Sequence, residues 1–137
     1  MSVVSSPSIE RKSFSKTVII CDDESDVLRV YKIALGSRFN VLTAMSGEDC
    51  IRTYSKSIES DGKVDLVVVD YRLGDMLGDE LARKLQKIAA TKVLLLTAFE
   101  IEPTYVSDLK SEKIISSFLK KPVGLASLIG TITELVG

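Results

Sequence analysis

The chain has 137 residues and a net charge of -1 at pH 7, from 18 lysines and arginines against 19 acidic residues. This length predicts one domain that buries a core without disulfides or metals, and the balanced charge gives no indication of a nucleic-acid partner. No apolar stretch approaches the roughly 20 residues needed to cross a bilayer, and residues 1–8 lack the apolar core of a signal peptide. We therefore expect a cytoplasmic protein with no membrane partner. Histidine chemistry is excluded because the chain has no histidine.

The beginning of the chain differs in composition from the rest. Residues 1–15 contain six serines, one proline and no sustained apolar period, which predicts a flexible tail. From residue 16 to residue 137, strand and helix patterns alternate and predict a single folded domain. Its two cysteines, Cys21 and Cys50, lack CxxC spacing, so we expect two free buried thiols.

Short apolar runs rich in β-branched residues recur along the chain. Runs that barely alternate are typical of strands buried on both faces, as in a parallel sheet covered by helices. A shorter run at residues 39–43 predicts one more strand, and Pro122 is expected to end the last one. The four main runs are residues 17–21, 64–69, 93–96 and 114–119.

Helix signals separate these runs. After the first run, Asp23 or Ser25 can cap a helix, and Gly36 stands where a left-handed stop is expected. After the run at residues 39–43, Ser46 and Asp49 resemble a capping box that opens a helix to about residue 57.

Three later helices are predicted from apolar residues at helical spacing. Gly78 and Asp79 start the first of them, and Pro103 suits the first turn of the next, whose apolar face is thin. The expected inward-facing residues are Leu81, Leu85 and Ile88 after Gly78, Val106 and Leu109 after Pro103, and Leu125, Leu128, Ile132 and Leu135 in the closing helix.

Five strand-helix units in sequence predict an α/β fold. We expect a flavodoxin-like, doubly wound (βα)5 sandwich with a parallel five-stranded sheet of order 2-1-3-4-5. In such sheets ligands bind outside the carboxyl ends of the strands, at the point where the strand order reverses. The polar residues that close the apolar runs fall at these ends: Asp22, Asp23, Asp70, Thr97 and Lys121.

Each of these polar residues has an ordinary structural alternative when taken alone. The two aspartates after the first run could cap the next helix, Thr97 could be a structural strand residue, and Lys121 could protect a sheet edge. Asp70 is harder to explain in this way, because an acid closing a buried run costs several kcal/mol if it is unpaired. Their coincidence at compatible strand ends favours a phosphate-handling acid site.

In order and spacing, these residues resemble the receiver domain of two-component response regulators, of the kind found in chemotaxis response regulators. The resemblance covers about residues 16–137. It is carried by the two aspartates after the first strand, by residues 70–78 after the third, by Thr97 and Ala98 after the fourth, and by Lys121 and Pro122 after the fifth.

The resemblance implies aspartyl phosphate chemistry that depends on Mg2+. A carboxylate is a poor nucleophile toward a dianionic phosphoryl group because like charges repel, so a metal and fixed cations are needed. Asp70 would be the nucleophile, and Thr97 and Lys121 would bind phosphoryl oxygens, Lys121 after pairing with Asp70 at rest. The implied Mg2+ ligands are Asp23 and Asp70 directly, Asp22 largely through water, and the backbone carbonyl of Arg72.

The resemblance also implies a signalling role. A partner histidine kinase or histidine phosphotransfer protein would phosphorylate Asp70, and Thr97 with Phe118 would switch the surface of the fourth helix, fifth strand and fifth helix. The recipient would be a downstream protein or a missing output domain, and a homodimer through the same surface is possible. The chain would catalyse only its own phosphorylation and dephosphorylation.

Two positions depart from the usual pattern of this family. Leu73 and Gly74 stand where receivers often have Met-Pro, which predicts a less rigid loop. Arg72 and Phe99 would border the path of attacking water and set the lifetime of the phosphoryl group.

Two rival functions stay open. A haloacid dehalogenase hydrolase would need a second aspartate where Arg72 stands. A receiver-like interaction module would never be phosphorylated.

Overall fold

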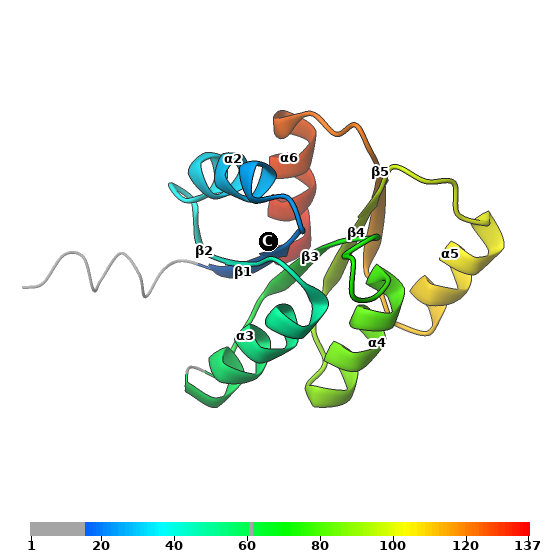
Figure 1. The fold of residues 1–137 in the computed structure, drawn as a ribbon, viewed down its shortest axis with the longest axis horizontal. Coiled ribbons are helices and arrows are strands. Elements are labelled where there is room, and N and C mark those ends of the chain that lie inside the picture. Colours follow the sequence, from blue (N-terminus) through cyan, green and yellow to red (C-terminus); the bar gives the residue numbers. More distant parts are fainter. Residues whose placement is uncertain (1–15, 61) are drawn as a thin grey trace, which may run out of the picture.

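One parallel sheet organises the chain in the computed structural model, which describes residues 16–60 and 62–137 (Figure 1). The predicted tail, residues 1–15, lies outside the described residues. The strand order β2-β1-β3-β4-β5 confirms the predicted doubly wound, flavodoxin-like topology. The strands are β1 (Lys16–Cys21), β2 (Phe39–Ala44), β3 (Leu66–Asp70), β4 (Val93–Thr97) and β5 (Ser117–Lys120).

Helices cover both faces of this sheet and make a three-layer sandwich (Figure 1). One face carries two helices, α2 (Ser25–Leu35) and α6 (Leu125–Val136). The other face carries α3 (Gly47–Ser60), α4 (Gly78–Ile88) and α5 (Pro103–Ser111). None of the helices in the described part of the chain is long and apolar enough to span a membrane.

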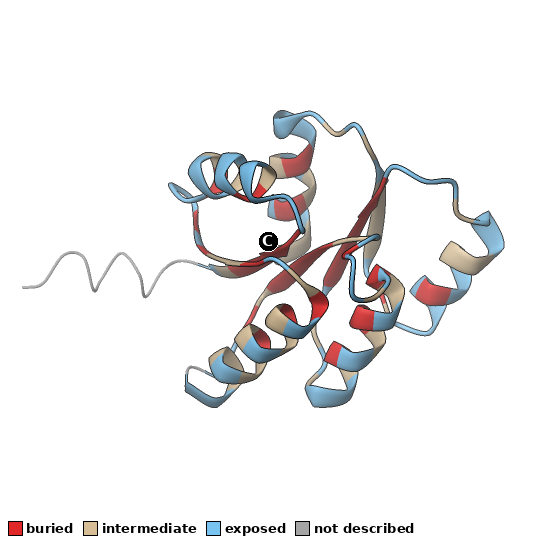
Figure 2. Cartoon of the chain, viewed as in Figure 1, coloured by how far each residue is buried: buried red, intermediate tan, exposed pale blue. Residues whose placement is uncertain are grey.

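The alternation of side chains along the strands divides the core into two clusters. Val18 and Ile20 pack toward α2 and α6, whereas Ile19 and Cys21 pack toward α3, α4 and α5. Because both faces are covered, the inner strands β1, β3 and β4 are buried along most of their length, whereas the edge strands β2 and β5 are only partly buried (Figure 2). Cys21 and Cys50 are both buried and free, as predicted.

The ends of α2 differ from the prediction. The helix begins at Ser25 with Glu24 as its N-cap residue, and no side chain caps it, so neither Asp23 nor Ser25 has that role. Gly36 has φ -65° and is not left-handed. Its lack of a side chain is explained by close approach instead, since a Cβ atom there would lie 2.7 Å from the carbonyl oxygen of Lys32.

The fifth strand begins later than the run at residues 114–119 predicts. The amides of Ile114 and Ile115 donate to the carbonyl oxygen of Leu109, at 2.9 and 3.3 Å, so these residues close the end of α5. Ile115 is nevertheless buried, which explains why an apolar residue stands there and why the apolar run begins before the strand. The strand also ends at Lys120, two residues before Pro122.

Other boundaries shift by a few residues. The third strand is Leu66–Asp70 rather than residues 64–69, and α3 continues to Ser60, past the predicted end at residue 57. Two side chains expected to face inward are on the surface: Ile88 is 42% exposed and Leu125 is 40% exposed. Both lie at an end of their helix, since Ile88 is the last residue of α4 and Leu125 is the first residue of α6.

Candidate acidic site at the carboxyl ends of the strands

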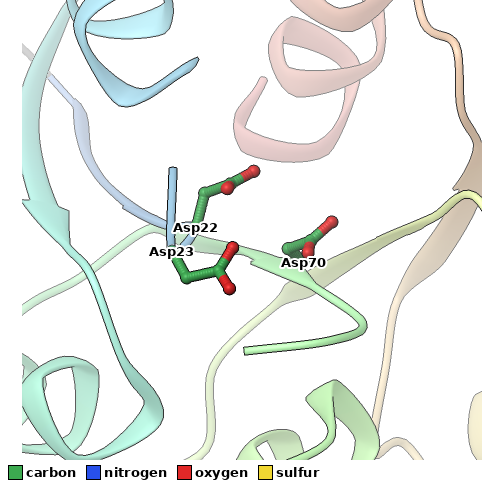
Figure 3. A group of neighbouring side chains, drawn as sticks. All are labelled: Asp22, Asp23 and Asp70. Carbon is green, nitrogen blue, oxygen red and sulfur yellow. The ribbon is translucent and has the colours of Figure 1, made fainter. Parts of the chain in front are cut away.

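Three acidic side chains converge at the carboxyl ends of β1 and β3 (Figure 3). Asp22 and Asp23 follow β1 directly, and Asp70 is the last residue of β3, which pairs with β1 in parallel. One carboxylate oxygen from each of the three lies within 4.8 Å of the other two. Asp22 is buried, Asp70 is half-buried and Asp23 is exposed, so the cluster is open to solvent at Asp23.

Asp22 has structural partners for both of its carboxylate oxygens. Its Oδ1 accepts a hydrogen bond from the backbone amide of Glu24 at 2.9 Å, and its Oδ2 lies 3.4 Å from the Nζ of Lys121. The first contact fixes the turn that leads from β1 into α2. Asp22 is therefore the buried acid of the cluster, held by Glu24 and Lys121, whereas Asp23 is the acid exposed to solvent.

Lys121 is the cation of the site. Its Nζ lies 2.7 Å from Asp70 Oδ1, so the resting pair implied by the resemblance is present. Its backbone amide donates to the carbonyl oxygen of Thr97 at 2.7 Å, which holds the residue beside β4. The neighbouring Lys120 forms an exposed ion pair with Glu100 and takes no part in the acidic cluster.

The electrostatics of the cluster leave an excess of negative charge. Burial raises the pKa of Asp70 above its ordinary value of 3.8, and the charges of Asp22 and Asp23 raise it further, against the lowering effect of Lys121. Burial would lower the pKa of Lys121, but its hydrogen bond to Asp70 and the charges of Asp70 and Asp22 raise the net value. Lys121 thus pairs with two of the three carboxylates, Asp22 and Asp70, and the remaining negative charge favours binding of a further cation.

The hydroxyl group of Thr97 contacts the backbone of Phe99, in the loop that follows β4. Thr97 is the last residue of β4 and is 1% exposed. Its Oγ1 accepts a hydrogen bond from the amide of Phe99 at 2.9 Å and lies 3.4 Å from the carbonyl oxygen of the same residue. Donation to a group on Asp70 would turn the hydroxyl hydrogen of Thr97 away from the carbonyl oxygen of Phe99.

An open cleft of about 640 Å³ lies over these residues. It brings together the predicted residues Asp23, Asp70, Thr97 and Lys121, whereas Asp22 lies beneath its floor. The other lining residues are Glu24, Tyr71, Arg72, Ala98, Phe99 and Pro122.

The two residues expected to border the approach to the nucleophile touch each other. The guanidinium carbon of Arg72 lies 4.1 Å from the centroid of the Phe99 ring, a cation-π contact. Both side chains are exposed and both line the cleft. They therefore join the loop after β3 to the loop after β4 across the mouth of the site.

Phe118, expected to act as a switch, lies in β5 on the neighbouring part of the sheet. It is half-buried and packs against the core cluster to which α5 contributes Leu109. Its partial exposure leaves room for a change of side-chain position, but its role in a switch stays a prediction.

Two residues near the site have roles that sequence patterns did not reveal. Gly78 is needed because a Cβ atom there would lie 2.9 Å from the carbonyl oxygen of Asp70 and 2.7 Å from a side-chain carbon of Leu95. Asp75 accepts hydrogen bonds from the first amides of α3. An acid next to a turn glycine was the only signal for Asp75, and it does not specify a partner 28 residues away in sequence.

Comparison with known proteins agrees with the family that the sequence resembles. The family model described as "Response regulator receiver domain" matches residues 18–133. The transcriptional regulatory protein GlrR of Escherichia coli is 31% identical over 119 residues, which cover 85% of this chain and 25% of GlrR. The phosphate regulon transcriptional regulatory protein PhoB of Pseudomonas aeruginosa is 27% identical over 128 residues, covering 88% of this chain and 52% of PhoB.

Among solved structures, a CheY-like response regulator receiver domain protein from Methanospirillum hungatei superposes with a TM-score of 0.77. It is 22% identical, and the match covers 89% of this chain and 94% of that one. The chain thus spans only part of the length of the curated relatives and nearly the whole of a separate receiver. With the family model covering most of its residues, the chain belongs to the response regulator receiver domain family.

Proposed function

We propose that the chain accepts a phosphoryl group on Asp70 in a Mg2+-dependent reaction and thereby switches a surface that binds a partner. The observation that carries this function is the convergence of Asp70 with Asp22, Asp23 and Lys121 beside one open cleft. Three carboxylates beside one lysine repel one another, and the turn contact that Asp22 makes with Glu24 does not require Asp23 and Asp70 to be there. Their arrangement matches what phosphoryl transfer requires, which is charge neutralisation and positioning.

The acidic cluster fits a Mg2+ ion. Mg2+ prefers oxygen ligands and keeps several waters, and three carboxylates converge here beside an open cleft. Asp23 and Asp70 would hold the ion, with the backbone carbonyl of Arg72 and with Asp22 acting largely through water. When bound, the ion would neutralise the charge of the incoming phosphoryl group and so lower its repulsion from Asp70.

Asp70, Lys121 and Thr97 would carry out the transfer of the phosphoryl group itself. An Asp70 oxygen attacks the phosphorus of a phosphohistidine on the donor, so an O–P bond forms and the P–N bond breaks. The electron pair returns to the imidazole nitrogen, which takes up a proton from solvent. Lys121 moves from its pair with Asp70 to a phosphoryl oxygen, as a compact charge on a flexible stem can. Thr97 turns its hydroxyl hydrogen from the carbonyl oxygen of Phe99 to another phosphoryl oxygen.

The donor and the recipient follow from the same chemistry. Without a histidine of its own, the chain takes its phosphoryl group from a histidine kinase or a histidine phosphotransfer protein. Movement of Thr97 and Phe118 then changes α5, β5 and α6, which present the signal to a downstream protein, to an output domain or to a second copy. The chain catalyses only its own phosphorylation and dephosphorylation.

Acetyl phosphate provides the test, because it supplies the phosphoryl group without a kinase. We expect the intact wild-type protein to gain the mass of one phosphoryl group in the presence of Mg2+ and to lose that gain with EDTA. Asp70→Asn should abolish the gain. Asp26→Asn, which removes an exposed acid from the first turn of α2, is the matched control and should leave the gain intact.

The two rival functions predict other results in this experiment. An interaction module that never accepts phosphate would show no gain at any Mg2+ concentration. A hydrolase would turn over the donor catalytically, releasing phosphate in large excess over protein without a lasting mass gain.

A further inference from the structure

The loop after the proposed nucleophile is a small hairpin. Arg72 and Leu77 form an isolated antiparallel bridge, and the amide of Gly78 donates to the carbonyl oxygen of Tyr71 at 2.6 Å. Nearer the tip, the amide of Leu73 donates to the carbonyl oxygen of Met76 at 3.2 Å. Gly74 and Asp75 form the tip of the hairpin. Arg72, whose carbonyl is an expected metal ligand, lies in the part of the hairpin that pairs with Leu77.

The hairpin tip carries a glycine with a left-handed backbone. Gly74 has φ +84°, a conformation that other residues adopt only with strain. The same glycine has more backbone freedom in other states than any other residue, so a hairpin with this tip is weakly ordered by its own sequence. A contact from outside the hairpin would therefore add to the order that its own backbone hydrogen bonds provide.

Asp75 supplies that external attachment by capping α3. Its Oδ1 accepts a hydrogen bond from the amide of Gly47 at 2.9 Å, and its Oδ2 accepts one from the amide of Glu48 at 3.0 Å. These are among the first amides of the helix, which have no partners within it, and a carboxylate is favoured there by the helix dipole. The amides of Glu48 and Gly47 accordingly hold the pKa of Asp75 below its ordinary value of 3.8.

A second contact closes the same junction. The side chain of Met76 lies against Gly47 so tightly that a Cβ atom on Gly47 would be 2.5 Å from Met76 Cγ. The bare backbone of Gly47 thus admits both the Met76 side chain and the Asp75 carboxylate. The hairpin is attached to α3 by a polar and an apolar contact at one point.

We propose that Asp75 is a positioning residue for the metal site, which holds the Arg72 carbonyl and the Asp70 loop in place by tying the hairpin tip to α3. This role rests on the proposed function, since it concerns the same Mg2+ site. Asp75 stands three residues beyond Arg72 in the hairpin, and it does not line the cleft. It therefore acts through backbone position and not as a ligand.

The test is the dissociation constant for Mg2+, measured by titrating backbone amide chemical shifts in the wild type and in Asp75→Ala. Loss of a group that orients a ligand typically weakens metal affinity by about 10-fold or more, so we expect at least a tenfold weaker constant. Asp75→Asn keeps an oxygen that can accept one of the two amides and should restore most of the affinity. The amides of Gly47 and Glu48 should exchange with solvent faster in the alanine variant.

Glu80→Gln is the matched control. Glu80 lies in the first turn of α4, beside the same hairpin, and pairs on the surface with Lys84 at 3.4 Å. This variant removes one negative charge near the site without touching the cap, and it should change the Mg2+ constant by less than twofold. An equal loss in Glu80→Gln and Asp75→Ala would show that charge alone explains the effect and would overturn the positioning role.

Other outcomes separate this role from the proposed function. Faster exchange of the Gly47 and Glu48 amides with an unchanged Mg2+ constant would mean that Asp75 only stabilises α3, which refutes the positioning role alone. Failure of Asp75→Asn to restore affinity would also refute it. If the wild type itself shows no Mg2+-dependent shifts, the metal site of the proposed function is wrong, and the role of Asp75 falls with it.

Discussion

The guanidinium carbon of Arg72 lies 4.1 Å from the centroid of the Phe99 ring and so closes a bridge over the mouth of the acidic cleft. Arg72 follows β3 and Phe99 follows β4, so the contact joins the two loops that follow these neighbouring strands. At an exposed position such a contact contributes about 0.5–1 kcal/mol. It is strong enough to keep the bridge closed most of the time and weak enough to open readily.

The first prediction is that this bridge prolongs the phosphorylated state. Hydrolysis needs a water in line with the phosphorus, opposite the Asp70 oxygen, and we expect the bridge to cover that approach because both side chains line the cleft. If water enters only when the contact opens, its loss should speed decay by roughly two- to fivefold, because about 1.4 kcal/mol corresponds to tenfold. The measurement is loss of phosphate after the donor is removed.

Three variants make this prediction specific to the contact. Arg72→Ala and Phe99→Ala each remove the whole contact, so the double variant should decay no faster than the faster single variant. Additive effects would mean that the two side chains act separately. Decay indistinguishable from the wild type in all three variants would refute the shielding role and leave the family assignment intact.

A second prediction concerns stability with and without Mg2+. Because the acids outnumber Lys121 in the cluster, binding of the ion should stabilise the fold. At a Mg2+ concentration of 100 times its dissociation constant, this gain is about 2.7 kcal/mol, or a rise in Tm of about 5–10 °C for a domain of this size. Thermal unfolding with Mg2+ and with EDTA measures it.

Asp23→Ala should remove this Mg2+-dependent rise in Tm, since Asp23 is the acid that faces the open side of the cluster. Lys120→Ala is the control, because Lys120 pairs with Glu100 outside the cluster. Equal loss of the rise in both variants would show that the metal site has been misplaced.

A third prediction assigns Thr97 to transmission of the signal. Its hydroxyl accepts a hydrogen bond from the amide of Phe99 at 2.9 Å, and its own hydrogen would turn from the Phe99 carbonyl oxygen to a phosphoryl oxygen. Thr97→Ala should therefore still be phosphorylated, but the phosphorylation-dependent shifts of amides in residues 103–136, which include Phe118, should shrink. Thr97→Ser keeps the hydroxyl and should retain them. Full-sized shifts in Thr97→Ala would rule out this coupling.

The fourth prediction gives the pH dependence of the cap made by Asp75. Its pKa is lowered in the folded protein, mainly by the amides of Glu48 and Gly47. A depressed pKa contributes stability that is complete above the unfolded value, near 3.8, and that is lost as the pH falls through the folded value. The difference in unfolding free energy between wild type and Asp75→Ala should therefore be constant from pH 7 to 5 and shrink below pH 4. Chemical denaturation measures it, and a difference that grows on acidification would contradict the cap.

Patterns in the sequence were sufficient for the strands that are buried on both faces and for the polar residues at their ends. Burial requires continuous apolar runs, and a parallel sheet brings the run ends together, so the convergence of Asp23 with Asp70 could be predicted. The start of β5 could not, because Ile115 is as buried in a loop as it would be in a strand. Local composition does not distinguish the two cases.

Contacts between distant segments account for the rest. Gly36 looks like a left-handed helix stop, yet it is needed for the approach of the Lys32 carbonyl, and only the packed helix end reveals this. The bonds from Asp75 to α3 cross 27 and 28 positions of sequence, and no periodicity encodes them. The contact between Arg72 and Phe99 likewise depends on how two loops meet in space.

The most direct measurement for the central claim is the chemical identity of the phosphorylated residue. An acyl phosphate on an aspartate is reduced by borohydride to homoserine, whereas a serine phosphate is not. After treatment with acetyl phosphate and Mg2+, peptide mass spectrometry should find homoserine at position 70 of the reduced wild-type protein, and at no other aspartate. Homoserine at another position, or a phosphoryl group that survives reduction on a serine, would contradict the assignment of Asp70.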